Sequence, residues 1–382
     1  MRVLGGIGSI VLTGSSARGR LASAIGAMAV LAACGTSTEP TGPHPVSPRL
    51  LTASDVTVSF LPVPAGVTIT ATRGVSSAGY IFGTSVTSSG ASTPYVWSRP
   101  YATAATQMAS TGAIGGLDAP NDAGESRGAV NGQAGIWSPA GSAWSFTTVS
   151  TAPYTATMLS GIDNGRALAG WGTRDGLQRA LWWSSPSASP SELPIPAIAD
   201  GTFGGARATA LNDAGAVVGE VRITTGSGRS ATTYSHVVLW TAGPQGWTAT
   251  RLPDAGPDNH AYDVNSAGQV AGIAGTKAVL WNPSGGGYTT TIVSASQGAL
   301  TRVDACGRVI GYTNSGSTSQ RRAFVWENGV LTTLPIPSGM VATEAEGIAA
   351  DPTTGRGIIV GRALPSGNGS PRPVQWSIPG CP

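Results

Sequence analysis

Side chains with catalytic or metal-binding chemistry are few in this chain of 382 residues. The three histidines, His44, His236 and His260, do not have the spacing of a zinc site. Lys277 is the only lysine, and it does not follow a glycine-rich phosphate-binding loop. The sequence therefore predicts no bound metal and no cofactor.

One short segment has the lettering of a hydrolase nucleophile. Residues 124–128 read Gly-Glu-Ser-Arg-Gly and match the G-x-S-x-G pattern. That motif needs a sharp turn from a strand into a helix. Here both glycines belong to a repeat, and sister copies have an apolar residue in place of Ser126. We therefore interpret Ser126 as structural.

Polar side chains recur at one position of a repeated strand and form the main candidate for a binding site. The first strand of each repeat ends in an apolar residue, here named the anchor. The residues two positions before the anchor are Arg73, Asp118, Ser160, Thr209, Tyr262, Thr301 and Glu346. Four positions before the anchor stand Arg207, His260 and Glu344. Since side chains alternate along a strand, both positions share a face. If the repeats form sheets, or blades, around a central channel, we expect these residues to surround the mouth of that channel. Glu346, Arg73 and Asp118 would then lie on consecutive blades as an acid, a base and an acid.

The same positions allow other interpretations. A polysaccharide hydrolase or lyase would need carboxylates such as Glu344 and Glu346, with a partner at glycosidase separation in an open cleft. The charges could instead form structural ion pairs in a water-filled channel. Trp144, Trp171 and Trp247 could stack on sugars, or could pack between sheets.

A repeat positions these residues. Each of seven copies has a short strand, a polar turn, a Gly-x-x-x-Gly segment with one extra residue in the third copy, and a strand that ends in tryptophan. The second glycine of each segment, here named the closing glycine, is Gly83, Gly128, Gly170, Gly219, Gly272, Gly311 or Gly361. The tryptophans are Trp97, Trp137, Trp183, Trp240, Trp281, Trp326 and Trp376. Turns such as Asn-Asp-Ala-Gly tolerate left-handed conformations and indicate hairpins.

Composition and spacing then predict the fold. The chain has 55 Gly and 27 Pro and is only 11% charged, which argues against long helices, while 41% apolar residues can bury a core. Each repeat has room for four short strands, and sheets arranged radially cover one another. The sequence therefore predicts an all-β fold, a seven-bladed β-propeller of four-stranded antiparallel blades. An open solenoid is the alternative.

Two leftover segments favour a closed ring. The last repeat stops at Trp376 and lacks a fourth strand. Residues 56–64 form an extra strand before the first repeat, and their sequence resembles the fourth strand at residues 330–337. We expect the N-terminal strand to complete the last blade, which would leave no exposed inner edge.

Two segments of the repeat resemble the HAF family of probable extracellular repeat proteins, named for a His-Ala-Phe tripeptide near its tryptophan. Residues 322–326, Arg-Ala-Phe-Val-Trp, are similar to the tripeptide half, and residues 212–219, Asn-Asp-Ala-Gly-Ala-Val-Val-Gly, to the other half. The similarity covers about residues 56–377. It implies a repeat scaffold without a common catalytic site.

Residues 1–33 have the features of a bacterial lipoprotein signal peptide. Arg18 and Arg20 precede an apolar run that is too short for a membrane span. The run ends in Leu-Ala-Ala-Cys, which resembles a lipobox in which Cys34 carries the lipid. An ordinary signal peptide with an incidental cysteine is the alternative.

Residues 34–50 would be the lipidated cysteine and a proline-rich tether, and residues 51–382 the propeller domain. Gly35 stands where lipoproteins retained at the inner membrane have Asp. We therefore expect a chain in the bacterial cell envelope, lipid-anchored at the outer membrane or cell surface.

The net charge of +3 comes from the leader. Three of the 22 basic residues lie in it, and the remaining 19 balance 19 acidic residues. No long-range positive field remains to attract nucleic acid. Beyond Cys34, only Cys306 and Cys381 remain, either as a disulfide that pins the C-terminus or as two separate thiols.

These observations predict a non-catalytic, lipid-anchored scaffold that binds a protein or glycan at loops or at the channel mouth. We expect a monomer, with the membrane as a partner through Cys34. The alternatives are a structural or adhesive surface protein without a discrete ligand, and the polysaccharide hydrolase or lyase.

Overall fold

The computed structural model describes residues 51–86, 92–108, 114–115, 117–314, 320–367 and 369–381. The predicted leader, the lipidation site Cys34 and the tether lie outside these residues. The described part includes two three-residue 3-10 turns, η1 (Ala53–Asp55) and η2 (Gly228–Ser230). None of its helices could therefore cross a bilayer.

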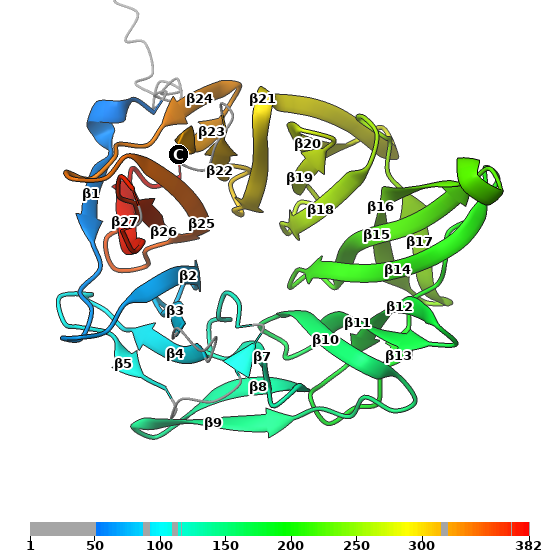
Figure 1. Ribbon diagram of the computed structural model, residues 1–382, viewed down its shortest axis with the longest axis horizontal. Coiled ribbons are helices and arrows are strands. Elements are labelled where there is room, and N and C mark those ends of the chain that lie inside the picture. The colour runs from blue at the N-terminus through cyan, green and yellow to red at the C-terminus, as the bar shows by residue number, and fades with distance from the viewer. Residues whose placement is uncertain are drawn as a thin grey trace, which may run out of the picture. The chain divides into compact units, whose positions relative to one another are not determined.

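The strands form antiparallel sheets arranged around a centre (Figure 1). Two sheets come from the first repeats: β2 (Ile69–Val75), β3 (Ile81–Val86), β4 (Ser92–Trp97) and β5 (Thr106–Gln107), then β6 (Ile114–Gly115), β7 (Ser126–Val130), β8 (Gln133–Ala140) and β9 (Ala143–Thr148). Two more follow: β10 (Thr155–Ile162), β11 (Leu168–Arg174), β12 (Leu177–Trp183) and β13 (Ser191–Glu192), then β14 (Thr202–Leu211), β15 (Ala216–Thr225), β16 (Thr232–Gly243) and β17 (Gly246–Arg251).

The next sheet has seven strands because one long strand belongs to two repeats. Its strands are β18 (Asn259–Val264), β19 (Val270–Ala274), β20 (Lys277–Ser284), β21 (Gly287–Val303), β22 (Val309–Thr313), β23 (Arg322–Glu327) and β24 (Val330–Thr333). The first part of β21 pairs with β20, with Thr290 opposite Trp281. Its last part pairs with β22, with Leu300 opposite Gly311.

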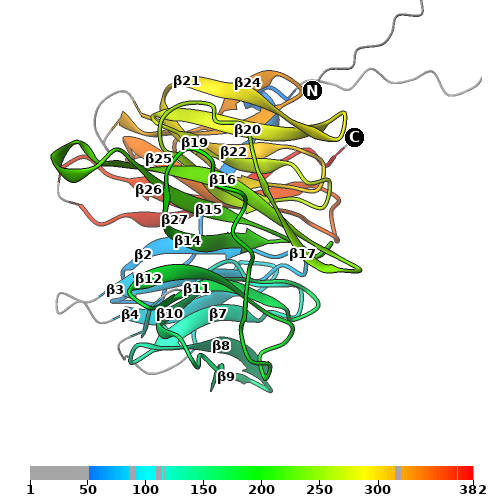
Figure 2. The same cartoon turned by 90° about the vertical axis from the view of Figure 1, so that its right-hand side faces the viewer.

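The N-terminal strand joins the last sheet, as the sequence predicts. That sheet has the order β1 (Thr57–Phe60), β27 (Arg372–Ile378), β26 (Gly357–Leu364) and β25 (Ala342–Ala350). Val58 of β1 lies opposite Trp376 of β27. Figure 1 shows these two strands, from opposite ends of the chain, side by side. In the side view (Figure 2), β15 and β16 extend past the neighbouring strands to the loop that joins them.

The repeat tryptophans tie each unit to the one before it. Five of them are almost fully buried, and each indole Nε1 donates to a backbone carbonyl in the segment that leaves the preceding sheet, at 2.6–2.8 Å. The pairs are Trp97 with Pro62, Trp183 with Ser150, Trp240 with Pro194, Trp281 with Pro253 and Trp376 with Pro335. Burial and a directional bond together fix the distance between successive sheets.

The innermost strands contain a β-bulge beside the closing glycine. In β14, Ala208 pairs with Gly219 and Ala210 with Val218, so Thr209 is an extra residue without a partner in the ladder. A Cβ on Gly219 would lie 2.0 Å from the carbonyl oxygen of Arg207. The same arrangement leaves out Arg73, Ser160, Tyr262, Thr301 and Glu346 in five other units. Only glycine therefore fits opposite the bulge.

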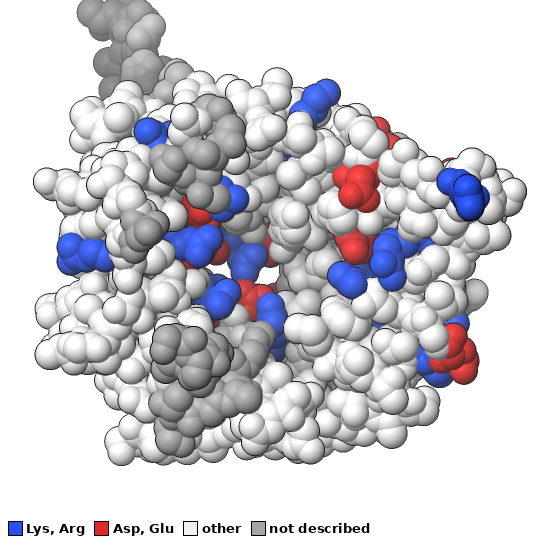
Figure 3. All heavy atoms as spheres, viewed as in Figure 1, with Lys and Arg blue, Asp and Glu red and all other residues white. Residues whose placement is uncertain are grey.

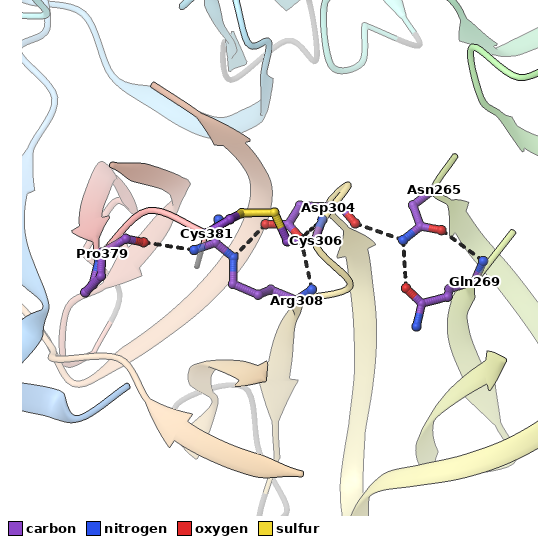
Figure 4. The surroundings of a disulfide bond; sticks show 7 residues. All are labelled: Asn265, Gln269, Asp304, Cys306, Arg308, Pro379 and Cys381. Carbon is purple, nitrogen blue, oxygen red and sulfur yellow. Dashed lines mark hydrogen bonds and ion pairs between the residues drawn. A yellow bond between two sulfur atoms is a disulfide. The ribbon is translucent and has the colours of Figure 1, made fainter. Parts of the chain in front are cut away.

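A disulfide joins Cys306, in the turn before β22, to Cys381, with 6.2 Å between the Cα atoms. Figure 4 shows that the buried Arg308 reinforces this connection. Its Nε donates to Asp304 at 2.7 Å, and its Nη1 donates to the carbonyl of Pro379 at 2.9 Å. The C-terminal segment is thus held against the preceding unit, which is the role that the sequence suggested for a bridge.

We predict that Trp240→Phe destabilises the protein by at least about 2 kcal/mol, because the carbonyl of Pro194 loses its donor and the smaller ring leaves a cavity. Trp326→Phe is the matched control, since Trp326 is only partly buried and has no hydrogen-bond partner among the described residues. It should cost under about 1 kcal/mol. Urea unfolding measures both values, and equal losses would contradict the role of the indole bond.

Cys306→Ser should lower the free energy of unfolding by about 2–4 kcal/mol, because the bridge closes a long loop in the unfolded chain. Cys381→Ser should give the same loss, and the double variant no further loss. Both sulfurs belong to exposed residues, so a reducing agent should reproduce the effect in the native protein. Additive losses in the double variant would show that the cysteines act separately.

Candidate binding site at the centre of the ring

Six of the seven residues two positions before the anchor are bulge residues of the innermost strands; Asp118 lies outside the paired residues of β6. An extra residue in a strand lies outside the regular pleat, and bulges redirect side chains in this way. Although these strands are innermost, none of the bulge residues is fully buried; Arg73 and Tyr262 are exposed, and the others are partly exposed. The polar character of this position, seen in the sequence, thus coincides with a particular backbone geometry.

Four units bring ring residues to one cavity of about 360 Å³. It is lined by Asp118, Arg127, Thr209, Tyr262, Ala299, Thr301, Arg302 and Tyr312. The space-filling view of this face shows acidic and basic side chains gathered around a central hollow (Figure 3). Of the seven residues predicted for binding, Asp118 and Tyr262 line this cavity, whereas Arg73, Arg207, His260, Glu344 and Glu346 are not among its lining residues.

Asp118 is held between two arginines. Nη2 of Arg127 donates to one carboxylate oxygen at 2.8 Å, and Nη2 of Arg302 donates to the other at 2.6 Å. Burial acts to raise the pKa of Asp118, but the two guanidinium charges outweigh it and hold the pKa below its usual value. The Ser126 hydroxyl, fully buried, donates to the carbonyl of Asp118 at 2.9 Å and accepts from its amide. Ser126 is therefore a positioning residue for Asp118.

Glu344 and Glu346 belong to a second charged group. Glu344 is buried and accepts from Arg321 at 2.6 Å and from Arg362 at 2.6 Å. Glu346 accepts from the hydroxyl of Thr72 at 2.6 Å and lies 3.5 Å from Arg362. Burial raises the pKa of Glu346 above its usual value, although the charge of Arg362 acts against it. Both carboxylates thus have hydrogen-bond and arginine partners within the protein.

The predicted alternation of Glu346, Arg73 and Asp118 does not form a chain of ion pairs. Nη2 of Arg73 donates to the hydroxyl of Thr84 at 3.2 Å, and Arg73 has no carboxylate partner within the described ranges. Glu346 pairs instead with Arg362 of its own sheet. The carboxylates of Asp118 and Glu346 pair instead with arginines from other positions of the repeat, as the alternative of structural ion pairs describes.

His260 lies in a carboxylate environment. Its Nδ1 bonds to Glu220 of the preceding sheet, and its Nε2 lies 3.1 Å from Asp258. The hydrogen bond with Glu220, followed by the charges of both carboxylates, overcomes partial burial and raises the pKa of His260 to about 9. The imidazole is therefore a cation at neutral pH, and both ring nitrogens donate.

The additional tryptophans mostly pack between sheets. Trp144 makes edge contacts with Tyr80 and Phe82, and Trp247 lies against Trp182 with 5.2 Å between ring centroids. Trp171 differs, because the Arg207 guanidinium lies 4.9 Å from its ring centroid. The packing interpretation thus describes Trp144 and Trp247.

Arg127, Arg302 and Tyr312 are site residues that the sequence reasoning missed. Arg127 directly precedes its closing glycine, and the same position in the other units holds Phe82, Ala169, Val218, Ala271, Ile310 and Val360. A charged residue at a repeat position that is otherwise apolar could have indicated a site residue. Arg302 follows the bulge, where most units have Gly or Ala. Tyr312 gave no comparable signal, because the position after the closing glycine varies among all units.

A second cavity, of about 270 Å³, lies among the turns between first and second strands. Here Asn164 links neighbouring units: its Nδ2 donates to Asp122 at 3.0 Å and to Asp213 at 2.9 Å. Asn212 donates to the carbonyl of Asn265, and Asn265 donates to that of Asp304. These polar groups satisfy the hydrogen-bonding capacity of one another, which indicates that the turns have a structural role.

No protein-family model and no curated protein sequence matches the chain. Among solved structures, YCF48 from Cyanidioschyzon merolae matches with a TM-score of 0.51 and 11% identity, over 84% of this chain and 98% of that chain. A structure described as one of two prolyl endopeptidases matches with a TM-score of 0.46 and 14% identity, over 81% of this chain and 46% of that chain. TolB from Acinetobacter baumannii gives a TM-score of 0.35 at 12% identity, over 86% and 65%. At such identities the likeness concerns the fold alone, which is β-propeller-like.

NMR titration should place the midpoint of His260 near pH 9 in the wild type. The pKa of His260 in the folded protein lies above the unfolded value of about 6.5. The charged imidazole therefore stabilises the folded state fully below pH 6.5, and this stabilisation is lost as the pH rises through 9. Glu220→Gln should move the midpoint toward 6.5 and flatten this pH dependence. Asp258→Asn should have a smaller effect. A midpoint that Glu220→Gln leaves unchanged would contradict the assigned pairing.

Proposed function

We propose that this chain is a non-catalytic, lipid-anchored β-propeller of seven blades, similar to the HAF repeat proteins, that binds a protein or glycan at its channel mouth. Seven blades follow if β21 is counted twice, as the fourth strand of one blade and the first of the next. The seven sequence repeats support this count, since each supplies one tryptophan and one closing glycine.

The cavity that receives side chains from four units carries the proposal. Its two aromatic residues, Tyr262 and Tyr312, bring aromatic rings and hydroxyl groups to the lining, with the Arg321 guanidinium stacked on the Tyr312 ring. Thr209 and Thr301 add two more hydroxyls, and Asp118 with its arginines adds fixed charges. A concave site with a few convergent polar groups is typical of ligand recognition.

The contacts of Glu344, Asp118 and Ser126 favour binding over catalysis. Glycoside hydrolysis needs one carboxyl group that can give up a proton and another that faces substrate. Glu344 is held by two arginines, and Asp118 is held by two others. Ser126 has no exposed surface and bonds to backbone atoms. These groups are engaged in structural contacts.

The cellular location of the chain in this proposal follows from the leader and the tether. A lipid on Cys34 would anchor the chain, and the proline-rich residues 35–50 would hold the domain away from the bilayer. The bacterial envelope, at the outer membrane or cell surface, is then where the channel mouth meets its ligand.

Glycan-array and pull-down screens with the full chain, solubilised in detergent, test the proposal. Tyr262→Ala and Tyr312→Ala should each weaken capture of the ligand by about tenfold or more, because both rings line the cavity. Tyr234→Ala is the matched control, since Tyr234 is 40% exposed and does not line the cavity. A ligand that binds all three variants equally well would place recognition elsewhere.

A further inference from the structure

Two arginines of the fourth repeat converge on one neutral oxygen atom. Nε of Arg207, in β14, donates to Oε1 of Gln178 at 2.7 Å. Nη2 of Arg222, in β15, donates to the same Oε1 at 2.9 Å. The two guanidinium groups are therefore neighbours across a single amide oxygen. Like charges at this separation repel, and one neutral acceptor offsets the repulsion only in part.

Neither guanidinium has a carboxylate partner in the part of the chain that the structure describes. Glu220 is opposite Arg207 in the β14–β15 register, but its carboxylate bonds to His260 of the next sheet. The arginines in the charged groups described above differ, because Arg127, Arg302, Arg321 and Arg362 all have acidic partners. Arg207 and Arg222 thus retain uncompensated positive charge.

The pair is held in position by its surroundings. The Arg207 guanidinium lies over the ring of Trp171, at 4.9 Å from its centroid. Nη2 of Arg222 fills the space beside Gly205, where a Cβ would approach it to 2.9 Å. Gly205 has a φ of +131°, which other residues rarely adopt. Both side chains are only partly buried, so solvent reaches them without a rearrangement.

We propose that Arg207 and Arg222 bind an oxyanion of an acidic glycan, a carboxylate or a sulfate group. This inference rests on the proposed function and names the class of its ligand. An oxyanion offers several acceptor oxygens and a negative charge, so it can accept from both guanidinium groups where Gln178 offers one oxygen. A glycan suits the cavity that Thr209, two residues along β14 from Arg207, helps to line, because all the uncharged polar side chains of its lining carry hydroxyls. The hydroxyls of Thr209 and Thr301 donate to backbone carbonyls and can still accept from sugar hydroxyls.

Calorimetry with the full chain and three soluble polymers tests the inference. Polygalacturonate supplies carboxylates, dextran sulfate supplies sulfates, and dextran is neutral. We expect at least one acidic polymer to bind tenfold or more tighter than dextran, and 0.5 M NaCl to weaken that binding. Arg207→Gln and Arg222→Gln should each reduce the affinity about tenfold while the melting temperature is retained.

Arg229→Gln is the matched control, because Arg229 is exposed in the η2 turn and its removal changes the net charge equally. It should leave the affinity unchanged. Equal binding of dextran, equal losses with Arg229→Gln, or equally tight binding of polyglutamate would overturn the inference.

If Tyr262→Ala abolishes capture of a ligand that Arg207→Gln and Arg222→Gln still bind, the proposed function stands and this inference fails. If acidic polymers need both arginines but not the tyrosines, the inference stands and the cavity is not the binding site.

Discussion

The close approach of the first two strands of each unit is the constraint on which the centre of the ring depends. At Gly219, Gly272, Gly311 and Gly361 a Cβ would lie 2.0 Å from a carbonyl oxygen of the neighbouring strand. The bulge next to that contact adds one residue to the innermost strand and takes it out of the ladder. Its side chain therefore lies outside the regular pleat, and its polar atoms bond to neighbouring strands, as Thr209 does to Val218 and Ser160 to Ala208. The repeat keeps its fold while this position changes from Ser160 to Tyr262 to Glu346.

The same repeat also determines how the ring closes. Each buried tryptophan packs within its own unit and donates to the segment leaving the unit before it, so no sheet is positioned by itself. Trp97 extends this chain of contacts across the closure, because its acceptor is Pro62, just after β1. The disulfide and Arg308 secure the other terminus. Closure thus depends on strand pairing, indole bonds and one covalent link together.

Much of this architecture could be predicted from the sequence because it recurs. The closing glycines, the tryptophans and the spare strand at residues 56–64 each predict an element that the structure contains. The polar column predicted the bulge residues, although nothing in the sequence indicated a bulge. Structural ion pairs are one interpretation of the sequence, but their partners could not be predicted, since Arg302 reaches Asp118 from a unit 184 residues away in the chain. Such partners depend on the three-dimensional closure of the ring and on side-chain length, which a pattern of single positions does not contain.

The central claim is that the bulge separates the chemistry of the central cavity from the stability of the fold. The most direct measurement compares the free energy of unfolding of two double variants in the same two units. Thr209→Ala with Tyr262→Ala changes only bulge residues and should cost under about 1.5 kcal/mol. Gly219→Ala with Gly272→Ala inserts a Cβ against backbone oxygen twice and should cost more than about 4 kcal/mol or prevent folding. Equal losses in the two double variants would contradict the account.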